Sequence, residues 1–117
     1  MKIKRGKIRW IDLNPTVGDE AAKIRPCLIL QNDLGNLHSR KTIVAPFLKS
    51  SSYPFVVNVT PSQLNNLDRE RGLNLSHLRS ISCKRVKGKL GKIEDKYWQD
   101  IKQAVLLQLG FDEIFNS

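Results

Sequence analysis

The sequence has few cysteines, few histidines and no metal-ligand cluster, and these shortages exclude several classes of protein. Its two cysteines, Cys27 and Cys83, lie in separate apolar segments without a second pair, which favours two buried thiols over a disulfide or a zinc site. The two histidines, His38 and His77, stand 39 positions apart with no carboxylates at ligand spacing. We therefore expect no metal and no cofactor, and a metal-dependent nuclease is disfavoured.

Long apolar stretches are also missing. The longest runs cover residues 27–30 and 43–48, whereas a transmembrane helix needs about 18 residues or more. The basic start of the chain leads into no apolar stretch long enough for a signal peptide, so we expect a cytoplasmic protein. Phosphate-binding glycine loops and a nucleophile elbow are absent too, which argues against nucleotide hydrolysis and esterase chemistry.

Acidic residues are scarce, and this gives the chain its strongest general signal. There are 11 Asp and Glu against 20 Lys and Arg, for a formal net charge of +9. Such an excess favours a polyanionic partner, because each phosphate neutralised by a basic side chain releases condensed counterions. Nucleic acid is the first expectation, and an anionic membrane surface is the second.

The pattern of apolar residues predicts short strands and one terminal helix. The predicted strands cover residues 7–11, 26–31, 42–47 and 55–59, with two more between residues 73 and 90. Loops are predicted at 12–20 and 49–52, and Thr60 with Pro61 is read as the start of a helical turn. Apolar residues from Tyr97 to Leu109 share one helical face, and Gly110 fits the helix end. We expect one domain over residues 1–117, a mostly β (α+β) fold with a compact barrel and a C-terminal α-helix.

Basic residues gather in two stretches that could line one groove. They are Lys2, Lys4, Arg5, Lys7 and Arg9 near the start, and Lys84, Arg85, Lys87, Lys89 and Lys92 near the end. A solvated surface is the alternative for each of them. Four aromatic residues at strand positions are either core residues or base-stacking platforms: Trp10, Phe47, Tyr53 and Phe55.

Arg25 is the most informative single residue. It lies between a polar loop and an apolar strand, immediately before Pro26. Because proline fixes the local backbone, the guanidinium should project from a rigid platform at the mouth of the loop. This position suits a phosphate clamp, with an ordinary surface arginine as the alternative.

Two ordered segments resemble the N-terminal signature of the MazF/PemK toxin family. They are RGKIRWIDLNPTVGDE at 5–20 and RPCLILQND at 25–33. The resemblance continues through residues 42–46, 53–55, 78–81, 84–85 and 90–91, and so covers nearly the whole chain. It implies an SH3-like β-barrel that forms a homodimer, cleaves single-stranded RNA without a metal and is held in check by a MazE/PemI-like antitoxin. No membrane partner is implied, and no DNA partner is expected for the toxin alone.

The resemblance also implies roles for individual residues. The catalytic Arg of the family's Arg-Pro step maps onto Arg25, and the Gly-x-Glu loop that borders and gates the groove maps onto residues 18–20. Cleavage in the family uses the RNA's own 2'-OH and leaves 2',3'-cyclic phosphate and 5'-OH ends. Arg25 would stabilise charge on the phosphate, since arginine is a poor base. The residues expected to line the RNA groove are Gly18, Asp19, Glu20, Lys49, Ser51, Ser76, Arg79, Lys84 and Arg85.

The chain departs from the family pattern two residues after Ala45-Pro46. The family usually has Thr or Ser there, and this chain has Leu48, which has no hydroxyl. We favour Ser50 as the substitute; a weakened site and a lost activity stay open. His77 is read as an acid-base candidate or as a polar filler.

Two rival functions stay open. Leu48 favours a non-catalytic RNA- or antitoxin-binding module on the same fold. A CcdB-type gyrase poison shares the fold but has no need of the Arg25-Pro26 step.

Overall fold

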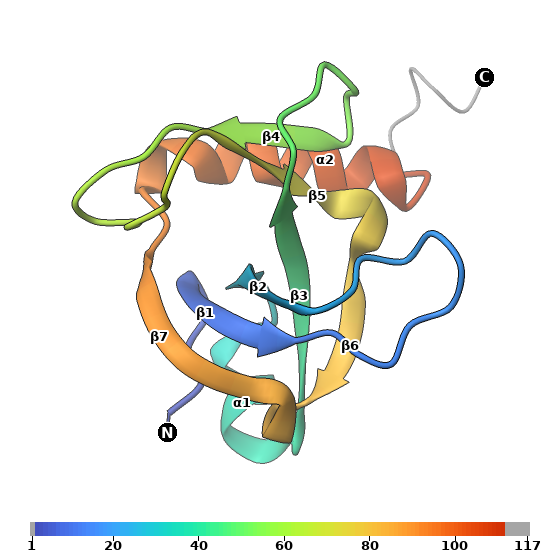
Figure 1. Ribbon diagram of the computed structural model, residues 1–117, viewed down its shortest axis with the longest axis vertical. Coiled ribbons are helices and arrows are strands. Elements are labelled where there is room, and N and C mark those ends of the chain that lie inside the picture. The colour runs from blue at the N-terminus through green and yellow to red at the C-terminus, as the bar shows by residue number, and fades with distance from the viewer. Residues whose placement is uncertain (1, 112–117) are drawn as a thin grey trace.

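A computed structural model describes residues 2–111 and shows a curled antiparallel sheet with a helix packed beside it (Figure 1). The strands are β1 (Lys7–Asp12), β2 (Ile24–Ile29), β3 (Lys41–Leu48), β4 (Val56–Val59), β5 (Arg71–Asn74), β6 (Arg79–Ser82) and β7 (Val86–Lys92). The α-helices are α1 (Asp33–His38) and α2 (Trp98–Gln108), and three short 3₁₀ helices are η1 (Leu75–His77), η2 (Cys83–Arg85) and η3 (Asp95–Tyr97).

The sheet follows the order β4-β5-β3-β2-β1-β7, and β6 pairs with β3 beside this path. The predicted mostly β fold with a C-terminal helix is thus confirmed. Its barrel is open, because the path ends at β4 and β7. The β1–β2 loop projects from the sheet on the same side as β6 (Figure 1).

Strands β2 and β3 are buried on both faces, which explains their apolar runs. Leu28 and Phe47 belong to one core cluster, which α2 completes with Ile101 and Ala104. Cys27 belongs to a second cluster with Ile11, Leu13, Ile29, Val44, Ile81 and Val86. Because successive side chains of a strand point to opposite faces, one run of residues supplies both clusters.

Several predicted boundaries are wrong by a few residues. Strand β2 covers Ile24–Ile29 and not 26–31. The turn predicted at Thr60 and Pro61 lies at 63–65, where the Ser62 hydroxyl caps it by accepting from the Asn65 amide at 3.0 Å. Ser62 is as good a cap as Thr60, and composition did not separate them.

Helix α1 was not predicted from the sequence. The side chain of Asn32 caps it by accepting from the Gly35 amide at 2.8 Å. None of its six residues is buried, so it has no apolar periodicity to detect.

The terminal helix follows the prediction, whereas the prediction of two buried thiols holds for Cys27 and is wrong for Cys83. Ile101 and Ala104 are the buried residues of α2, and Gly110 lies just beyond it with a φ of +80°. Cys27 and Cys83 are both free; Cys27 is buried, whereas Cys83 is half-buried. Within residues 2–111, no helix is both long enough and apolar enough to span a bilayer.

Candidate active site

A pocket of about 430 Å³ opens between the β1–β2 loop and the segment from η1 to β6. We call it the His77 pocket. Five of the predicted site residues line it: Asp19, Glu20, Ser76, His77 and Arg79. Leu13, Val17, Ala21, Pro46 and Leu78 complete the lining. The fold thus joins two segments of predicted site residues that are more than 50 positions apart in the sequence.

His77 is held by the loop opposite. Its Nδ1 accepts a hydrogen bond from the Ala21 amide at 3.3 Å. Because Nδ1 is the acceptor, the neutral imidazole carries its hydrogen on Nε2. The ring therefore offers an N–H donor, and not a free base, at Nε2.

The β1–β2 loop is shaped by its own acidic residue. Glu20 accepts from the Val17 amide at 2.5 Å through its side chain, and its amide donates to the Val17 carbonyl at 3.3 Å. Gly18 adopts a φ of +58° between them, which glycine takes without steric cost. Asp19 and Glu20 are exposed, so they border the pocket without filling it.

Two of the predicted RNA-binding arginines hold the end of β1. Arg79 donates from Nη1 to the Leu13 carbonyl at 3.2 Å. Arg85 donates from Nη1 to the Asp12 carbonyl at 3.1 Å and also to the Asn14 carbonyl. Arg79 faces the His77 pocket, whereas Arg85 does not line it, and the adjacent Lys84 is exposed on η2.

Arg25 lines a second pocket, of about 210 Å³, which we call the Arg25 pocket. Its Nε donates to the Ala22 carbonyl at 2.9 Å, which fixes the guanidinium. Its Nη groups make no hydrogen bond to residues 2–111 and remain available to a ligand. The other lining residues are Trp10, Ile24, Pro26, Phe47, Asn66, Asp68, Arg71 and Leu90.

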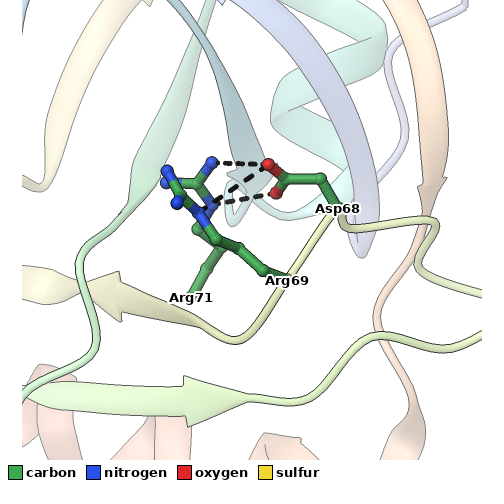
Figure 2. Close-up of polar contacts among 3 residues, drawn as sticks. All are labelled: Asp68, Arg69 and Arg71. Carbon is green, nitrogen blue, oxygen red and sulfur yellow. Dashed lines mark hydrogen bonds and ion pairs between the residues drawn. The ribbon is translucent and has the colours of Figure 1, made fainter.

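An ion pair in this lining was missed from the sequence. Arg71 grips Asp68 with two hydrogen bonds, Nε to Oδ1 at 3.0 Å and Nη2 to Oδ2 at 2.8 Å (Figure 2). Arg69 lies 3.8 Å from the same carboxylate. The hydrogen bond from Arg71 lowers the pKa of Asp68 below its ordinary value. The charged residues of the lining are Arg25, Arg71 and Asp68, so the Arg25 pocket keeps a net positive charge.

The four aromatic residues lie in three different places: one at a pocket, one in the core and two stacked on each other outside both pockets. Trp10 is 38% exposed and lines the Arg25 pocket, where a base can stack on it. Phe47 is 1% exposed and belongs to the core. Tyr53 stacks on Phe55 with ring centroids 5.2 Å apart.

Arg79 of the His77 pocket and Arg25 of the Arg25 pocket both influence the pKa of the buried Cys27 thiol. Burial raises the pKa of Cys27 to about 12, while the charges of Arg79 and then Arg25 oppose that rise. The Cys27 Sγ donates to the Arg25 carbonyl at 3.7 Å. Cys27 therefore stays protonated and inert, and it lies within electrostatic reach of both pockets.

The sequence pattern of the family described as PemK-like, MazF-like toxin of type II toxin-antitoxin system matches residues 4–109. The chain belongs to this family. The Endoribonuclease MazF of Staphylococcus saprophyticus is 32% identical over 115 residues, which cover 96% of this chain and 95% of the relative. This homology confirms the predicted enzyme class, an endoribonuclease toxin of the MazF type.

Solved structures of MazF-like proteins share the fold. MazF from Deinococcus radiodurans superposes with a TM-score of 0.79 at 22% identity, covering 94% of this chain and 98% of that one. A mycobacterial endoribonuclease, solved with its cognate antitoxin, gives a TM-score of 0.76 at 20% identity, covering 94% and 97%.

The structure shows where Leu48 and the serines that follow it lie. Leu48 pairs with Gly72 of β5, and a Cβ at Gly72 would lie 3.2 Å from the Ser50 Cα. Lys49 and Ser50 therefore lie beside β5. Neither they nor Ser51 line the His77 pocket or the Arg25 pocket. The catalytic role of Ser50 stays a prediction.

The loop that carries Ser51 is tied to β4. The Ser51 amide donates to the side chain of Asn58 at 3.0 Å, and that side chain donates back to the Ser51 carbonyl at 2.8 Å. The Ser51 hydroxyl accepts from the Tyr53 amide at 3.1 Å.

Within residues 2–111, no three His, Cys, Asp or Glu side chains gather as ligands for a metal ion.

Proposed function

We propose that this toxin cleaves single-stranded RNA sequence-specifically and without a metal ion, at the surface formed by the His77 pocket and the Arg25 pocket. The observation that carries the proposal is Arg25 itself. Its Nε is fixed on the Ala22 carbonyl, its Nη groups are free of partners among residues 2–111, and it shares its pocket with the exposed ring of Trp10. A positioned guanidinium next to a stacking surface suits a phosphate between two unpaired bases.

The proposed reaction is an internal transfer at phosphorus. The 2'-OH loses its proton and its oxygen attacks the adjacent phosphorus, while the bond from phosphorus to the 5'-oxygen breaks and that oxygen takes up a proton. The products are a 2',3'-cyclic phosphate and a 5'-OH. Because the nucleophile is part of the substrate, no metal-bound hydroxide is required.

Arg25 and His77 have different parts in this proposal. The guanidinium of Arg25 stabilises the negative charge that develops on the phosphate oxygens. The Nε2–H of His77 suits a hydrogen bond to a phosphate oxygen, since its Nδ1 is already occupied by Ala21.

The proposed partners follow from the net charge of the chain and from the solved structures of related proteins. A net charge of +9 complements both RNA and an acidic antitoxin. Solved structures with the same fold include a mycobacterial endoribonuclease in complex with its cognate antitoxin, and MazE-MazF from Deinococcus radiodurans. We infer a MazE/PemI-like antitoxin, a homodimer built from single-domain chains of residues 1–117, and action on mRNA in the cytoplasm.

One observation favours a second candidate function. Leu48 removes the hydroxyl that the family usually carries beside the arginine, so a binding module that has lost cleavage is the alternative. RNA binding without cleavage distinguishes it from the enzyme.

The test uses a long mixed-sequence single-stranded RNA incubated with the protein in EDTA, followed by mapping of the new ends. We expect cuts at a defined motif that leave 5'-OH ends, and we expect Arg25→Ala to abolish them. Arg25 is half-buried near the start of β2, so Arg25→Ala should change the free energy of unfolding by about 1 kcal/mol or less. The matched control is Arg40→Ala, which removes an exposed arginine outside both pockets. Binding without cleavage by the wild type would instead support the binding module.

A further inference from the structure

Arg9 is a buried cation without a partner. It is 4% exposed, and its Nε and Nη2 atoms are buried with no hydrogen-bond acceptor among residues 2–111. Burial lowers the pKa of its guanidinium from the ordinary value. A buried charge without a partner is destabilising, so its presence in β1 calls for an anion that the chain itself does not supply.

Arg71 has a carboxylate partner, and Arg9 has none in the part of the chain that the structure describes. Arg71 uses Nε and Nη2, one edge of its guanidinium, to grip the two oxygens of Asp68. Arg9 leaves the same two atoms unused. Because these two atoms are buried, an external anion is attracted by the charge of the guanidinium and does not grip this edge as Asp68 grips Arg71; no carboxylate in the pocket lining offsets that charge.

Arg9 lines a pocket of about 510 Å³ that is lined by further cations. We call it the Arg9 pocket. Its charged lining residues are Lys2, Lys4, Lys7, Arg9, Lys89 and Lys92, and no carboxylate accompanies them. The remaining lining residues are Ile8, Leu64, Leu90 and Gly91.

The strand register brings these like charges face to face. Arg9 is opposite Lys89, and Lys7 is opposite Lys92, across β1 and β7. Like charges directly opposite each other destabilise a pair of strands. Two such pairs around one unpartnered guanidinium conflict with stability, and conflicts of this kind are typical of binding sites.

The Arg9 pocket adjoins the Arg25 pocket. Leu90 of β7 lines both, and the side chain of Asn66 donates to its carbonyl at 2.8 Å. Trp10, which follows Arg9 in β1, lines the Arg25 pocket. Because successive residues of a strand point to opposite faces, the residue that connects the two pockets is Leu90, and an RNA strand bound at Arg25 would pass Leu90 to reach the Arg9 pocket.

We propose that the Arg9 pocket binds a backbone phosphate of the same single-stranded RNA whose scissile phosphate lies at Arg25. This inference rests on the proposed function for its substrate. Six cations around one pocket suit a chain of phosphates better than a single carboxylate, and the position next to the Arg25 pocket favours RNA over an acidic polypeptide.

The test measures binding of a mixed-sequence 2'-O-methyl RNA, which has no free 2'-OH and so cannot be cleaved. Affinity is measured over a range of salt concentrations for the wild type, for Arg9→Met, and for the Lys89→Gln/Lys92→Gln double variant. The matched control is Lys41→Gln, which removes one exposed charge from β3 outside the Arg9 pocket.

The slope of log affinity against log salt is negative, and for each lost contact we expect it to become shallower by about 0.7. That change corresponds to about fivefold weaker binding at roughly 0.1 M salt, relative to 1 M. Lys41→Gln should keep the wild-type slope. Without RNA, Arg9→Met should melt at the same temperature as the wild type or higher, because it removes a buried unpaired charge.

Unchanged slopes in both pocket variants overturn the proposal. It is overturned as well if Arg9→Met lowers the melting temperature while the lysine double variant keeps its slope, because Arg9 is then structural. It also falls if poly-glutamate binding depends on Arg9 and RNA binding does not, because the partner is then an acidic polypeptide.

RNA cleavage tests the proposed function, and the salt dependence of binding tests the Arg9 pocket. A wild type that fails to cleave RNA but shows the expected slopes contradicts the cleavage and supports the Arg9 pocket. If the wild type cleaves RNA and the pocket variants keep the wild-type salt slope, the cleavage is supported and the Arg9 pocket is contradicted. A wild type that binds no RNA contradicts both.

Discussion

The Nδ1 atom of His77 accepts a hydrogen bond from the backbone amide of Ala21 at 3.3 Å, across 56 positions of sequence. This contact closes one side of the His77 pocket, because Ala21 lies in the β1–β2 loop and His77 ends η1. It also selects the tautomer of the ring, since an acceptor at Nδ1 places the hydrogen on Nε2. The shape of the pocket and the chemistry of the imidazole therefore depend on the same bond.

We predict that His77→Ala lowers kcat/KM for RNA cleavage about 100-fold, the usual effect of removing one hydrogen-bond donor from a developing oxyanion. The Ala21 amide should also exchange its hydrogen faster in this variant, because it loses its acceptor. Single-turnover cleavage and hydrogen exchange monitored by NMR measure the two effects.

The control for this variant is His38→Ala, which removes the other histidine from an exposed position on α1. It should leave both quantities at the wild-type value. Faster exchange at Ala21 with an unchanged cleavage rate would limit His77 to a structural role.

A second prediction concerns the pH dependence of the Asp68–Arg71 ion pair. The hydrogen bond from Arg71 lowers the pKa of Asp68 in the folded protein. A lowered folded pKa means that the stabilisation is fully present above the unfolded value, about 3.9, and is lost as the pH falls through the folded value. The wild type should therefore be more stable than Asp68→Asn at neutral pH, and the two should converge in acid.

Urea unfolding across the acid range measures this convergence, and a carboxyl titration followed by NMR measures the pKa of Asp68 directly. In Arg71→Gln the pKa should return toward its ordinary value. An Asp68 that titrates alike in the wild type and in Arg71→Gln would show that the pair in Figure 2 does not form in solution.

The Asp68–Arg71 pair also shows where sequence reasoning ends. The strands and the terminal helix were predictable because their apolar residues repeat with a period. The place of Arg25 next to a loop, at the start of a strand, was predictable from the polar segment before it and the apolar segment after it, whereas its catalytic role stays a prediction. By contrast, Asn66 and Asp68 lie in a polar connection between β4 and β5 that has no period, and its path over the Arg25 pocket depends on tertiary contacts such as the bond from Asn66 to Leu90.

The Ser50 region illustrates the same limit for the candidate site. The sequence places Ser50 two residues after Leu48, near the missing hydroxyl. The direction of the chain after β3 is set by the pairing of Leu48 with Gly72, which spacing alone does not reveal. That pairing carries Ser50 toward β5.

A third prediction concerns the two thiols. Burial raises the pKa of Cys27 to about 12, so its thiolate is almost absent near neutral pH. Cys83 is half-buried. Iodoacetamide should therefore add first to Cys83, and to Cys27 only after unfolding, as measured by mass spectrometry of peptides. Cys83→Ser should remove the fast adduct, and equal labelling rates for both cysteines in the wild type would contradict the prediction.

The last prediction asks whether Leu48 limits this enzyme. A hydroxyl at this position would supply the hydrogen-bonding group that the resemblance to the MazF/PemK family led us to expect there, and a group worth about 1.4 kcal/mol in the transition state changes the rate tenfold. Leu48→Thr should therefore raise the single-turnover cleavage rate about tenfold. Leu48 is half-buried in β3, and threonine is a good strand residue, so the fold should tolerate the change.

Ser50→Ala, made in the wild type and in Leu48→Thr, tests whether Ser50 supplies the missing hydroxyl. If it does, Ser50→Ala slows the wild type about tenfold and has little effect in the Leu48→Thr background, because the two hydroxyls serve the same purpose. Ser52→Ala, at an exposed position in the same loop, is the control and should change neither rate. Equal cleavage by the wild type and Ser50→Ala would remove Ser50 from the mechanism and leave Arg25 to act without a neighbouring hydroxyl.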